Sequence, residues 1–463
     1  MKAMTIEEVI EATSGTLLKG NPSDEITNVV FDSREVGEGT LFVPIIGERV
    51  DAHKFIPDVM KAGAVATFTS NKDIQLSDGN YILVEDTLAA MQDLAGYYRK
   101  QFDIPVIGVT GSVGKTTTKE MISAALGAGY KVHKTAGNSN GQIGLPITLF
   151  GIDDETEIAV IEMGMSLPGE MARIVDIARP QTAVLTNVGV SHIGNLGSRA
   201  NIAKEKGNIV KYLTEYFYIC GNGDMIPLTK ENVPYDICEN DIKTIYYGED
   251  ESLDIYASEI EVGENSQSFV YNGKSKVKVT LSVLGSHNIN NALVAMALAE
   301  QYGVDPTKAA KALSEYKSYD MRGVVKEVDG IRVVDDTYNA SPDSVNSNVK
   351  MLFDYPGEGR RIAVLADVLE LGEQSEELHR GMGSFIAGLA GEGKRLDLVV
   401  TYGDMAKYIC KQISEECDIP TESFDDHDSV AKYLKDYAKA GDVILVKGSR
   451  GMQMDKVVDM ICN

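Results

Sequence analysis

The chain has 463 residues, which is too long for a single hydrophobic core and predicts roughly two to four domains. Hydrophobic residues make up 43% of the sequence and charged residues 24%, as is typical of soluble globular proteins. The formal net charge of −25 argues against binding to nucleic acid or to an anionic membrane. An anionic substrate could still bind where lysine, arginine or Mg²⁺ reverses the sign of the field locally.

The cysteine pattern and the hydropathy of the chain indicate its compartment. The five cysteines are scattered, and no pair has Cys-x-x-Cys spacing, which indicates free thiols in a reducing compartment. No stretch approaches about 18 uninterrupted apolar residues, and Met1–Glu8 contains carboxylates where a signal peptide has an apolar run. We therefore expect a cytoplasmic protein without membrane insertion, and we take a monomer as the expected state.

The first section of the chain, residues 1–102, mixes short strands with helical segments. Apolar runs predict strands over 39–44, 64–68 and 81–84, and a helical pattern covers 88–101. This section contains no phosphate-binding loop. We therefore expect a separate N-terminal α/β domain.

Residues 108–117, Gly-Val-Thr-Gly-Ser-Val-Gly-Lys-Thr-Thr, are the most informative stretch of the sequence. An apolar run over 104–109 precedes the turn and a helical segment over 117–126 follows it, which is the strand–loop–helix context of a phosphate-binding P-loop. The usual spacing has a glycine where this chain has Val109, but the Gly-Lys-Thr ending is intact. The alternative is a Gly- and Thr-rich turn without a ligand, which the intact ending and both flanks disfavour.

Each residue type in this loop suits a phosphate chain. Glycines at 111 and 114 let the backbone curl so that N–H groups converge on an anion, and the helix N-terminus adds partial positive charge. Lys115 can reach the β- and γ-phosphates, and the Thr116 hydroxyl can ligate Mg²⁺. The predicted nucleotide-binding residues are Gly111, Ser112, Val113, Gly114, Lys115, Thr116 and Thr117.

Polar residues follow the strands of the central section, residues 103–317. Apolar strands over 158–161 and 183–185 end at Glu162 and at Thr186-Asn187. Strands that alternate with helices predict a parallel sheet, and ligands of such sheets bind beyond the carboxyl ends of the strands. These polar residues are therefore expected at the edge that holds the P-loop.

Three further residues of the central section have a functional and a structural interpretation. Glu162 could hold Mg²⁺ opposite the P-loop or be a surface carboxylate. His192 lies after the next strand and could ligate a second cation or its water, although most lone histidines are structural. Lys206 lies in a lysine-rich helical stretch, which taken alone indicates a solvated face.

The end of the central section contains a predicted change of architecture. Residues 244–282 alternate apolar and polar positions, which predicts an antiparallel extension, and a helix over 290–302 is expected to close the domain. The segment Gly285-Ser-His-Asn288, with Asn291, lies at the start of this helix. Its Ser and Asn side chains could be N-caps, or an Asn amide could recognise the adenine edge.

The third section, residues 318–463, repeats the pattern of strands with polar exits. Apolar runs over 331–334, 362–365, 398–400 and 443–446 predict a second doubly wound parallel sheet. It has no P-loop, so we expect it to complete a site rather than to hold the nucleotide.

Charged residues of the third section could complete that site. Arg322 and Lys447 could neutralise phosphate or carboxylate, and Asp336 could accept hydrogen bonds from ribose hydroxyls. Without further context these three residues would be ordinary surface charges.

Together these segments resemble the Mur ligases of bacterial cell-wall synthesis, over almost the whole chain and in the expected order. The matching segments are Phe31-Asp-Ser-Arg34, Gly39–Pro44, Thr110–Thr117, Gly137–Asn140, Ile143–Pro146, Glu162-Met-Gly164, Asn187–His192, Gly285–Asn288 with Asn291, and Met321-Arg322. The most discriminating segments, Asp335–Pro342, Leu369–Gly372 and Val446–Met454, resemble the members that add D-alanyl-D-alanine. The chain departs from the family pattern at Gly141, Ser341 and Ala366.

The resemblance implies an α/β protein of three domains. These are an N-terminal α/β uridine-nucleotide domain (1–102), a central P-loop parallel-sheet ATPase domain (103–317) and a C-terminal Rossmann-like domain (318–463). It implies ATP and two Mg²⁺ ions as ligands. Lys206 matches the lysine that related ligases carbamylate, and a carbamate there could help to hold the second Mg²⁺.

The resemblance also implies a role for each candidate residue. The implied catalytic residues are Lys115, Glu162, His192 and Lys206. The implied metal-site residues are Thr116, Glu162 and His192. Further ATP contacts are Asn291, Arg322 and Asp336. The implied substrate contacts are Ser33, Arg34, Asn138, Asn140, Lys447 and Arg450.

The implied reaction is ATP-driven amide formation. The carboxylate of a UDP-N-acetylmuramoyl-tripeptide is activated as an acyl phosphate, and the amine of D-alanyl-D-alanine then attacks it. The C-terminal domain is expected to close over the central one, with hinges near Ser318–Arg322. The alternatives are another ligase of the superfamily, tripeptide-forming or folate polyglutamate type, and a P-loop ATPase switch. Asp32-Ser-Arg34 favours a UDP substrate, and the third residue of the tripeptide, lysine or diaminopimelate, stays open.

Overall fold

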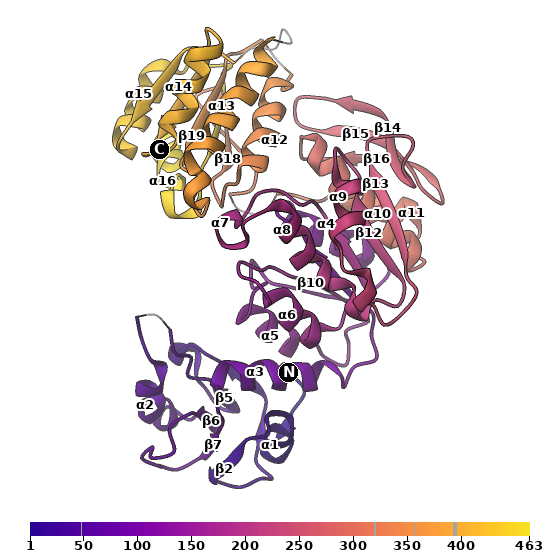
Figure 1. Ribbon diagram of the computed structural model, residues 1–463, viewed down its shortest axis with the longest axis vertical. Helices are drawn as coiled ribbons and strands as arrows, with labels where there is room; N and C mark the ends of the chain where they lie inside the picture. Colours follow the sequence, from indigo (N-terminus) through magenta and orange to yellow (C-terminus); the bar gives the residue numbers. More distant parts are fainter. Residues whose placement is uncertain (48, 319–320, 357, 392–395) are drawn as a thin grey trace.

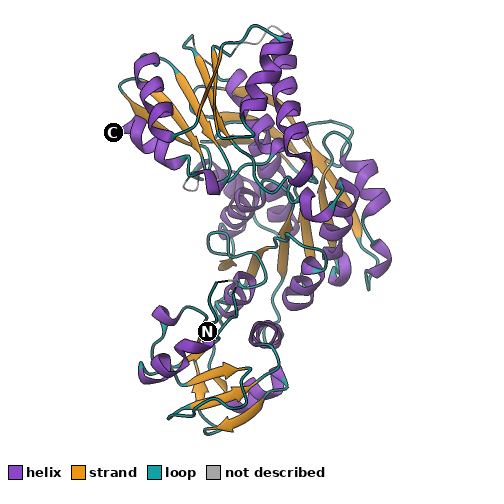
Figure 2. Cartoon of the chain, turned by 60° about the vertical axis from the view of Figure 1, so that its left-hand side comes forward, coloured by secondary structure: helices purple, strands orange, loops and turns teal. Residues whose placement is uncertain are grey.

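The computed structural model describes residues 1–47, 49–318, 321–356, 358–391 and 396–463. They form three α/β lobes along a curved molecule, with the N-terminal lobe at one end and the C-terminal lobe at the other (Figure 1). The central lobe lies between them and contacts both (Figure 2). The predicted hinge near Ser318–Arg322 includes residues 319–320, which lie outside the described residues.

The N-terminal lobe is built on a five-stranded sheet in the order β2-β7-β6-β5-β4. All neighbours in this sheet are parallel except β2 and β7, which pair antiparallel. The strands predicted over 39–44, 64–68 and 81–84 correspond to β5, β6 and β7. The strands are β2 (Thr16–Lys19), β4 (Asn28–Val30), β5 (Thr40–Phe42), β6 (Ala66–Thr69) and β7 (Asn80–Leu83), with β1 (Met4–Thr5) and β3 (Glu25–Ile26) in a separate pair.

Helix α3 (Thr87–Arg99) connects the N-terminal lobe to the central one. It begins where the Asp86 side chain accepts a hydrogen bond from the Ala89 N–H, which satisfies one of the free first-turn donors. Its buried face packs against central helices α5 (Gly144–Phe150) and α6 (Glu170–Ala178). The other helices of the lobe are α1 (Ile6–Thr13) and α2 (Ile56–Lys61).

The central lobe contains a nine-stranded sheet in the order β16-β15-β14-β13-β12-β11-β8-β10-β9. The sheet is parallel from β9 to β14, and only the β14-β15-β16 end is antiparallel. The prediction of an antiparallel extension over 244–282 is therefore wrong for its first part, because β13 and β14 pair in parallel. The strands are β8 (Val106–Thr110), β9 (Val132–Lys134), β10 (Ile158–Glu162), β11 (Thr182–Leu185), β12 (Tyr216–Cys220), β13 (Lys243–Gly248), β14 (Ile255–Val262), β15 (Gln267–Asn272) and β16 (Lys276–Leu281).

Helices cover both faces of this sheet. Helix α10 (Ser286–Gln301) packs against α4 (Lys115–Gly127), and every residue from Asn291 to Ala299 is buried. A helix that is apolar on all sides must be enclosed, which explains its central position. It begins four residues before the predicted start. The remaining helices of the lobe are α7 (Ile193–Leu196), α8 (Arg199–Gly207), α9 (Met225–Asn232) and α11 (Pro306–Ser314).

The C-terminal lobe is a six-stranded sheet in the order β17-β18-β22-β19-β20-β21, parallel except for β17. The four predicted strands are β18, β19, β20 and β22. The edge strands β17 and β21 were not predicted, because their half-exposed residues give no continuous apolar run. The strands are β17 (Val324–Val328), β18 (Ile331–Asp336), β19 (Arg361–Ala366), β20 (Leu398–Tyr402), β21 (Thr421–Phe424) and β22 (Val443–Lys447), and the helices are α12 (Pro342–Phe353), α13 (Ser375–Gly391), α14 (Lys407–Glu416), α15 (His427–Tyr437) and α16 (Asp455–Cys462).

A helix that spans a membrane needs about 20 predominantly apolar residues in a row. Within the described ranges, no helix combines the length and the apolar character for this.

Candidate active site

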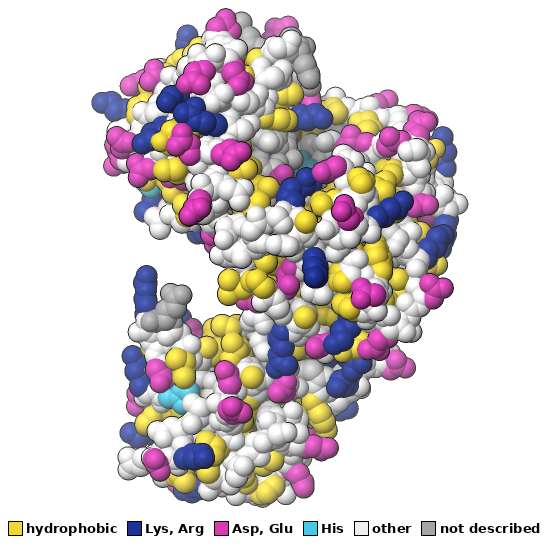
Figure 3. Space-filling model, in the orientation of Figure 1, with side chains coloured by type: hydrophobic (Ala, Val, Ile, Leu, Met, Phe, Trp, Pro, Cys, Tyr) yellow, Lys and Arg dark blue, Asp and Glu magenta, His cyan; other side chains and the backbone are white. Residues whose placement is uncertain are grey.

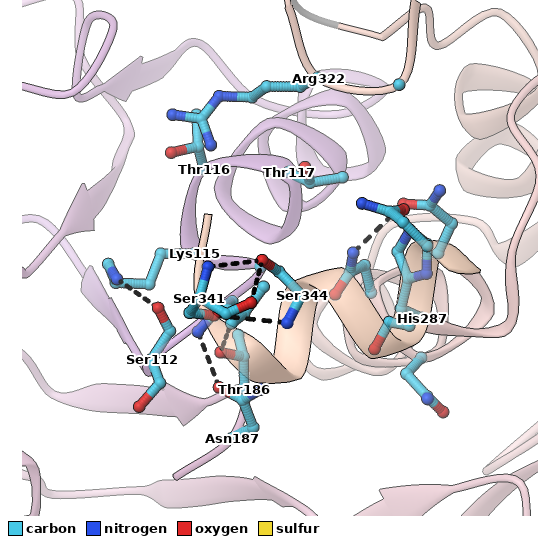
Figure 4. A pocket seen from close by; sticks show the side chains of 18 of the residues that line it. Ser112, Lys115, Thr116, Thr117, Thr186, Asn187, His287, Arg322, Ser341 and Ser344 are labelled. Carbon is cyan, nitrogen blue, oxygen red and sulfur yellow. Dashed lines mark hydrogen bonds between the residues drawn. The ribbon is translucent and has the colours of Figure 1, made fainter. Parts of the chain in front are cut away.

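A cavity of about 1640 Å³ lies between the central and C-terminal lobes. Side chains from both lobes surround it, among them Lys115 and Thr116 of the P-loop and Arg322 and Ser341 of the C-terminal lobe (Figure 4). The residues predicted from the sequence that line it are Ser112, Val113, Gly114, Lys115, Thr116, Thr117, Asn138, Asn140, Glu162, His192, Asn291, Arg322, Asp336 and Lys447. The structure thus brings most of the predicted site into one space.

Sheet register explains why these residues meet. Strand β8, which leads into the P-loop, lies between β10 and β11. Glu162 at the end of β10 is level with Val109, and Leu185 of β11 is level with Thr110. Parallel strands end at the same edge, so Glu162 and the segment after β11 flank the loop.

The P-loop conformation depends on glycine at two positions. Gly111 has a φ of +150°, and a Cβ atom placed on it would lie 1.9 Å from the Thr186 hydroxyl oxygen. Gly114 has a φ of +85° and is the N-cap of α4. Both positions therefore need a residue without a side chain.

Part of the P-loop amide cradle is occupied by Asn187. The Ser112 N–H donates to the Asn187 carbonyl at 3.1 Å, and the Val113 N–H donates to the Asn187 side-chain oxygen at 2.8 Å. No side chain caps α4, so its first-turn N–H groups, Lys115 to Thr117, are the donors that point at an anion. The sequence places Asn187 directly after a strand but does not predict that it fixes the loop.

The Lys115 ammonium lies across the mouth of the loop. Its Nζ donates to the carbonyl oxygens of Gly111 at 2.7 Å and of Ser112 at 3.2 Å. Burial lowers the pKa of Lys115, and nearby Arg322 lowers it further while Glu162 opposes the shift. A buried ammonium whose hydrogen-bond acceptors are neutral carbonyl oxygens is stabilised when an anion binds beside it, and a phosphate group would be such an anion.

Glu162 has the features of a cation ligand. It is 1% exposed, and its Oε1 accepts hydrogen bonds from the Thr116 hydroxyl at 3.1 Å and the Asn140 amide at 2.6 Å. Its Oε2 is buried without a hydrogen-bond partner, 3.8 Å from the Lys119 ammonium. A buried carboxylate oxygen left unpaired is costly, and a hard cation such as Mg²⁺ would satisfy it.

Protein side chains alone do not enclose a metal ion here. Across the residues that the structure describes, no group of three or more His, Cys, Asp or Glu side chains is arranged to hold one. That fits Mg²⁺, which keeps several waters and is usually bound through one or two carboxylates together with substrate phosphates.

His192 lies in the loop between β11 and α7, with its backbone in the left-handed region at φ +62°. Burial lowers the pKa of His192, and the positive charges of Lys115 and Lys206 lower it further, while the Glu370 carboxylate opposes the shift. Its Nδ1 lies 2.8 Å from the Glu370 Oε2 atom of the C-terminal lobe. Burial and two ammonium groups therefore favour the neutral imidazole, which is the form that ligates metals.

Lys206 does not lie on a solvated face, so the interpretation from its lysine-rich stretch alone is wrong. It is 1% exposed, and its Nζ donates to the Gly111 carbonyl at 3.1 Å. Burial and the nearby Lys115 charge hold the pKa of Lys206 well below its usual value. Apolar Ile202, four residues earlier on the same helix and also buried, was the available signal that Lys206 lies on the buried face of α8.

The segment at the start of α10 does not cap the helix through its side chains. The N-cap is Gly285, without a side-chain hydrogen bond, so the capping interpretation is wrong. Asn288 donates instead to the Leu284 carbonyl at 2.7 Å. The Asn291 side-chain oxygen accepts a hydrogen bond from the Thr118 hydroxyl at 2.8 Å, which fixes α10 against the P-loop helix.

The C-terminal lobe contributes a cation and an ion pair to the cavity. The Arg322 guanidinium lies over the Tyr338 ring at 3.8 Å, and its Nε is buried without a hydrogen-bond partner. Asp336 and Lys447 are neighbours on β18 and β22 and form an ion pair. The Asp336 carboxylate is therefore already engaged.

Five predicted residues do not line the cavity. Gly111, at the start of the P-loop, and Lys206 are not among the lining residues, and the Lys206 Nζ donates to the Gly111 carbonyl. Arg450 contacts the Met321 sulfur at 3.3 Å. Ser33 and Arg34 belong to the N-terminal lobe. An open notch separates that lobe from the C-terminal lobe (Figure 3).

Comparisons with known proteins agree with this arrangement. Three family models, the Mur ligase catalytic, middle and glutamate ligase domains, match residues 25–99, 109–299 and 322–450. The chain is 37% identical to the UDP-N-acetylmuramoyl-tripeptide--D-alanyl-D-alanine ligase of Bacillus subtilis (strain 168), over 98% of this chain and 97% of that one. It resembles the crystal structure of MurF from Acinetobacter baumannii with a TM-score of 0.89 and 27% identity, over 100% and 99% of the two chains. MurF from Thermotoga maritima in complex with ADP gives a TM-score of 0.81 and 30% identity, over 94% and 96%. The chain therefore belongs to the Mur ligase family.

Proposed function

We propose that the protein is an ATP-dependent ligase that joins D-alanyl-D-alanine to the carboxylate of a UDP-N-acetylmuramoyl-tripeptide, giving the pentapeptide used in peptidoglycan synthesis. The observation that carries this proposal is the single cavity in which the P-loop faces Arg322, Asp336 and Lys447. An activated acid and an incoming amine must meet beside the nucleotide, and one shared space allows this. The Bacillus subtilis relative named for this activity matches over nearly the whole chain.

The main obstacle of the reaction is the repulsion between the attacking carboxylate and the γ-phosphate, and residues of the P-loop offset it. A carboxylate oxygen attacks the γ-phosphorus and ADP leaves; the amine then attacks the acyl carbon, phosphate leaves and a proton is released. The first step brings two anions together, and Lys115 and the first-turn N–H groups of α4 offset their repulsion. The acyl phosphate would hydrolyse in water, and a cavity enclosed by two domains protects it.

We propose two Mg²⁺ ions, one at Thr116 and Glu162 and the other at His192. The unpaired Oε2 of Glu162 and the neutral imidazole of His192 support this assignment. Bound Mg²⁺ would neutralise charge on the phosphate oxygens. The ADP complex of the Thermotoga maritima relative supports ATP as the nucleotide. We assign Asn291, Arg322 and Asp336 as further nucleotide contacts because they line the same cavity as the P-loop.

We assign the remaining substrate contacts and the domain boundaries as proposals. Ser33 and Arg34 would contact the uridine diphosphate, and the peptide contacts would be Asn138, Asn140, Lys447 and Arg450. Domains of 1–102, 103–317 and 318–463 are supported by the gaps between α3 and β8 and between α11 and β17. ATP and a UDP-linked precursor are both cytoplasmic metabolites, so we place the reaction in the cytoplasm.

Formation of ADP tests the proposed function. We expect ADP to form at a substantial rate only when both the UDP-linked tripeptide and D-alanyl-D-alanine are present. A coupled assay with each substrate omitted in turn measures this. Turnover of ATP that is indifferent to both peptides would favour an ATPase switch, and turnover with a folate substrate would favour the folate polyglutamate type.

We further propose that Lys206 is carbamylated. Its amine is buried and its pKa lies well below the usual value, which raises the fraction of the neutral amine, the form that attacks CO₂. A carbamate would place an anion beside the lysine of the P-loop, in a region where Lys115 otherwise adds only positive charge.

Replacing Lys206 by methionine removes the amine and keeps most of the buried volume. We expect activity to fall about 10–100-fold, as for other groups that support a metal site. Magnetic resonance after exchange with isotope-labelled bicarbonate should show a carbamate carbonyl signal that Lys206→Met lacks. Lys204→Met, on the exposed side of the same helix, is the control. A wild-type spectrum identical to that of Lys206→Met would refute the modification.

A further inference from the structure

The segment Asn187–Leu196, termed here the bridging loop, contacts both halves of the active site. On one side it holds the P-loop: Asn187 accepts hydrogen bonds from the Ser112 and Val113 N–H groups. The Gly189 N–H also donates to the Ser112 hydroxyl at 2.9 Å. The position of the bridging loop is therefore tied to the position of the phosphate-binding amides.

On its other side the bridging loop meets the C-terminal domain at three points. The Val190 N–H donates to Asp343 Oδ2 at 3.0 Å. The His192 Nδ1 lies 2.8 Å from Glu370 Oε2. The backbone of Gly194 approaches the C-terminal domain so closely that a Cβ atom there would lie 3.1 Å from the Glu370 carbonyl oxygen and the Gly372 nitrogen.

Glu370 is presented by a loop that is fixed within its own domain. The Val368 N–H donates to the buried imidazole of His379 at 3.0 Å, and the Leu369 N–H donates to the Ser449 hydroxyl at 2.9 Å. Glu370 itself has a left-handed backbone with a φ of +64°. The backbone that carries the Glu370 carboxylate is therefore fixed to the C-terminal domain.

The contact between Glu370 and His192 affects which imidazole nitrogen carries the proton and which can bind a cation. The Nδ1–Oε2 separation is short, but the two groups are not aligned as a hydrogen bond. A carboxylate beside Nδ1 still favours a proton on that nitrogen, which leaves the lone pair of Nε2 available to a cation. Carboxylates that orient a metal-binding histidine in this way are common partners in metal sites.

We propose that Glu370 of the C-terminal domain is a positioning residue that orients the His192 imidazole, so that the cation site beside the P-loop is complete only when the C-terminal domain is docked. This inference rests on the proposed function, since it assumes that His192 serves a cation. It makes domain docking a condition for assembling the site, which would link peptide capture to phosphate chemistry.

Manganese binding tests this inference separately from ligation. Mn²⁺ is titrated into the full chain with a non-hydrolysable ATP analogue and followed by electron paramagnetic resonance. Glu370→Gln keeps the shape of the side chain and should weaken Mn²⁺ binding by about 10-fold. His192→Ala should weaken the same site by at least as much, while the contacts from the phosphates and Glu162 leave binding measurable. Gly194→Val should weaken the same site without removing any polar group, because its side chain would push the two domains apart.

Two controls and a double mutant exclude a merely structural effect. Glu373→Gln changes an exposed carboxylate of the same segment, and Gly381→Ala adds a methyl group where no atom lies within 4 Å; both should bind Mn²⁺ like the wild type. In a His192→Ala background, Glu370→Gln should have no further effect. In metal-free protein with isotope-labelled histidine, Glu370→Gln should shift the His192 ring-nitrogen signals toward the other tautomer.

The opposite results would overturn the inference. Wild-type Mn²⁺ affinity in Glu370→Gln, or an equal loss with and without His192, would show that Glu370 does not act through the imidazole. The proposed function fails by a different result, which is ADP formation that ignores the two peptide substrates.

Discussion

Lys115→Ala is expected to reduce ligation by about 10²–10³-fold, the loss typical of removing one preorganised group that stabilises developing charge. The ammonium lies at the mouth of the P-loop, held by the carbonyl oxygens of Gly111 and Ser112. Without it, the attacking carboxylate and the γ-phosphate face each other with less positive charge between them. Steady-state ADP formation at saturating substrates measures the loss.

Binding of the uridine nucleotide should survive the same substitution. Its proposed contacts, Ser33 and Arg34, lie in the N-terminal lobe, so calorimetric affinity for the UDP-linked tripeptide should be unchanged. Lys131→Ala is a suitable control, because Lys131 forms an exposed ion pair with Glu155 and such pairs contribute little. Ligation at the wild-type rate in Lys115→Ala would show that the assigned role of Lys115 is wrong.

A second consequence of this variant concerns Lys206. The Lys115 charge is one reason why the pKa of Lys206 lies well below its usual value. Removing that charge should let the pKa of Lys206 rise, so less of the amine is neutral and able to react with CO₂. The two lysines are therefore coupled, and the effects of changing both should not add.

The sequence predicted the parts of the fold whose signal is local. The buried strands of the parallel sheets are continuous apolar runs, and the P-loop has its own spacing of glycine, lysine and threonine. Because parallel strands end at a common edge, the positions of Glu162 and Asn187 at or near the carboxyl ends of their strands are enough to place them near the loop. Edge strands β17 and β21 lack such runs, and their pairing depends on neighbours that are distant in the chain.

The parts of the site that the sequence did not predict depend on contacts between elements. Lys206 is buried because its helix packs with this side chain against the P-loop, where its Nζ donates to the Gly111 carbonyl. The number of lysines in the surrounding stretch does not reveal this contact. The pairing of Glu370 with His192 joins residues of two domains, and a strand-by-strand interpretation gives them no reason to meet. The strand before Asn187 predicts the sheet edge at which this residue lies. That Asn187 accepts hydrogen bonds from two P-loop N–H groups depends on the loop conformation, which the sequence does not reveal.

Glu162→Gln is expected to damage both catalysis and stability. The amide can still accept hydrogen bonds from Thr116 and Asn140, but its NH₂ group would replace the unpaired Oε2 and face the Lys119 ammonium. A buried donor without an acceptor costs about 1–3 kcal/mol, which thermal unfolding would detect.

The same variant separates two roles of this carboxylate. If Glu162 holds Mg²⁺, the rate should fall about 10²–10³-fold and the Mg²⁺ concentration needed for half-maximal rate should rise. Glu120→Gln is the matched control, because Glu120 also pairs with Lys119 but does not line the cavity. A lower rate with an unchanged Mg²⁺ requirement would mean that Glu162 acts only by positioning Thr116 and Lys119. The unpaired Oε2, buried in a site built for anions, makes the cation role the stronger expectation, since a carboxylate there would otherwise repel the phosphates it faces.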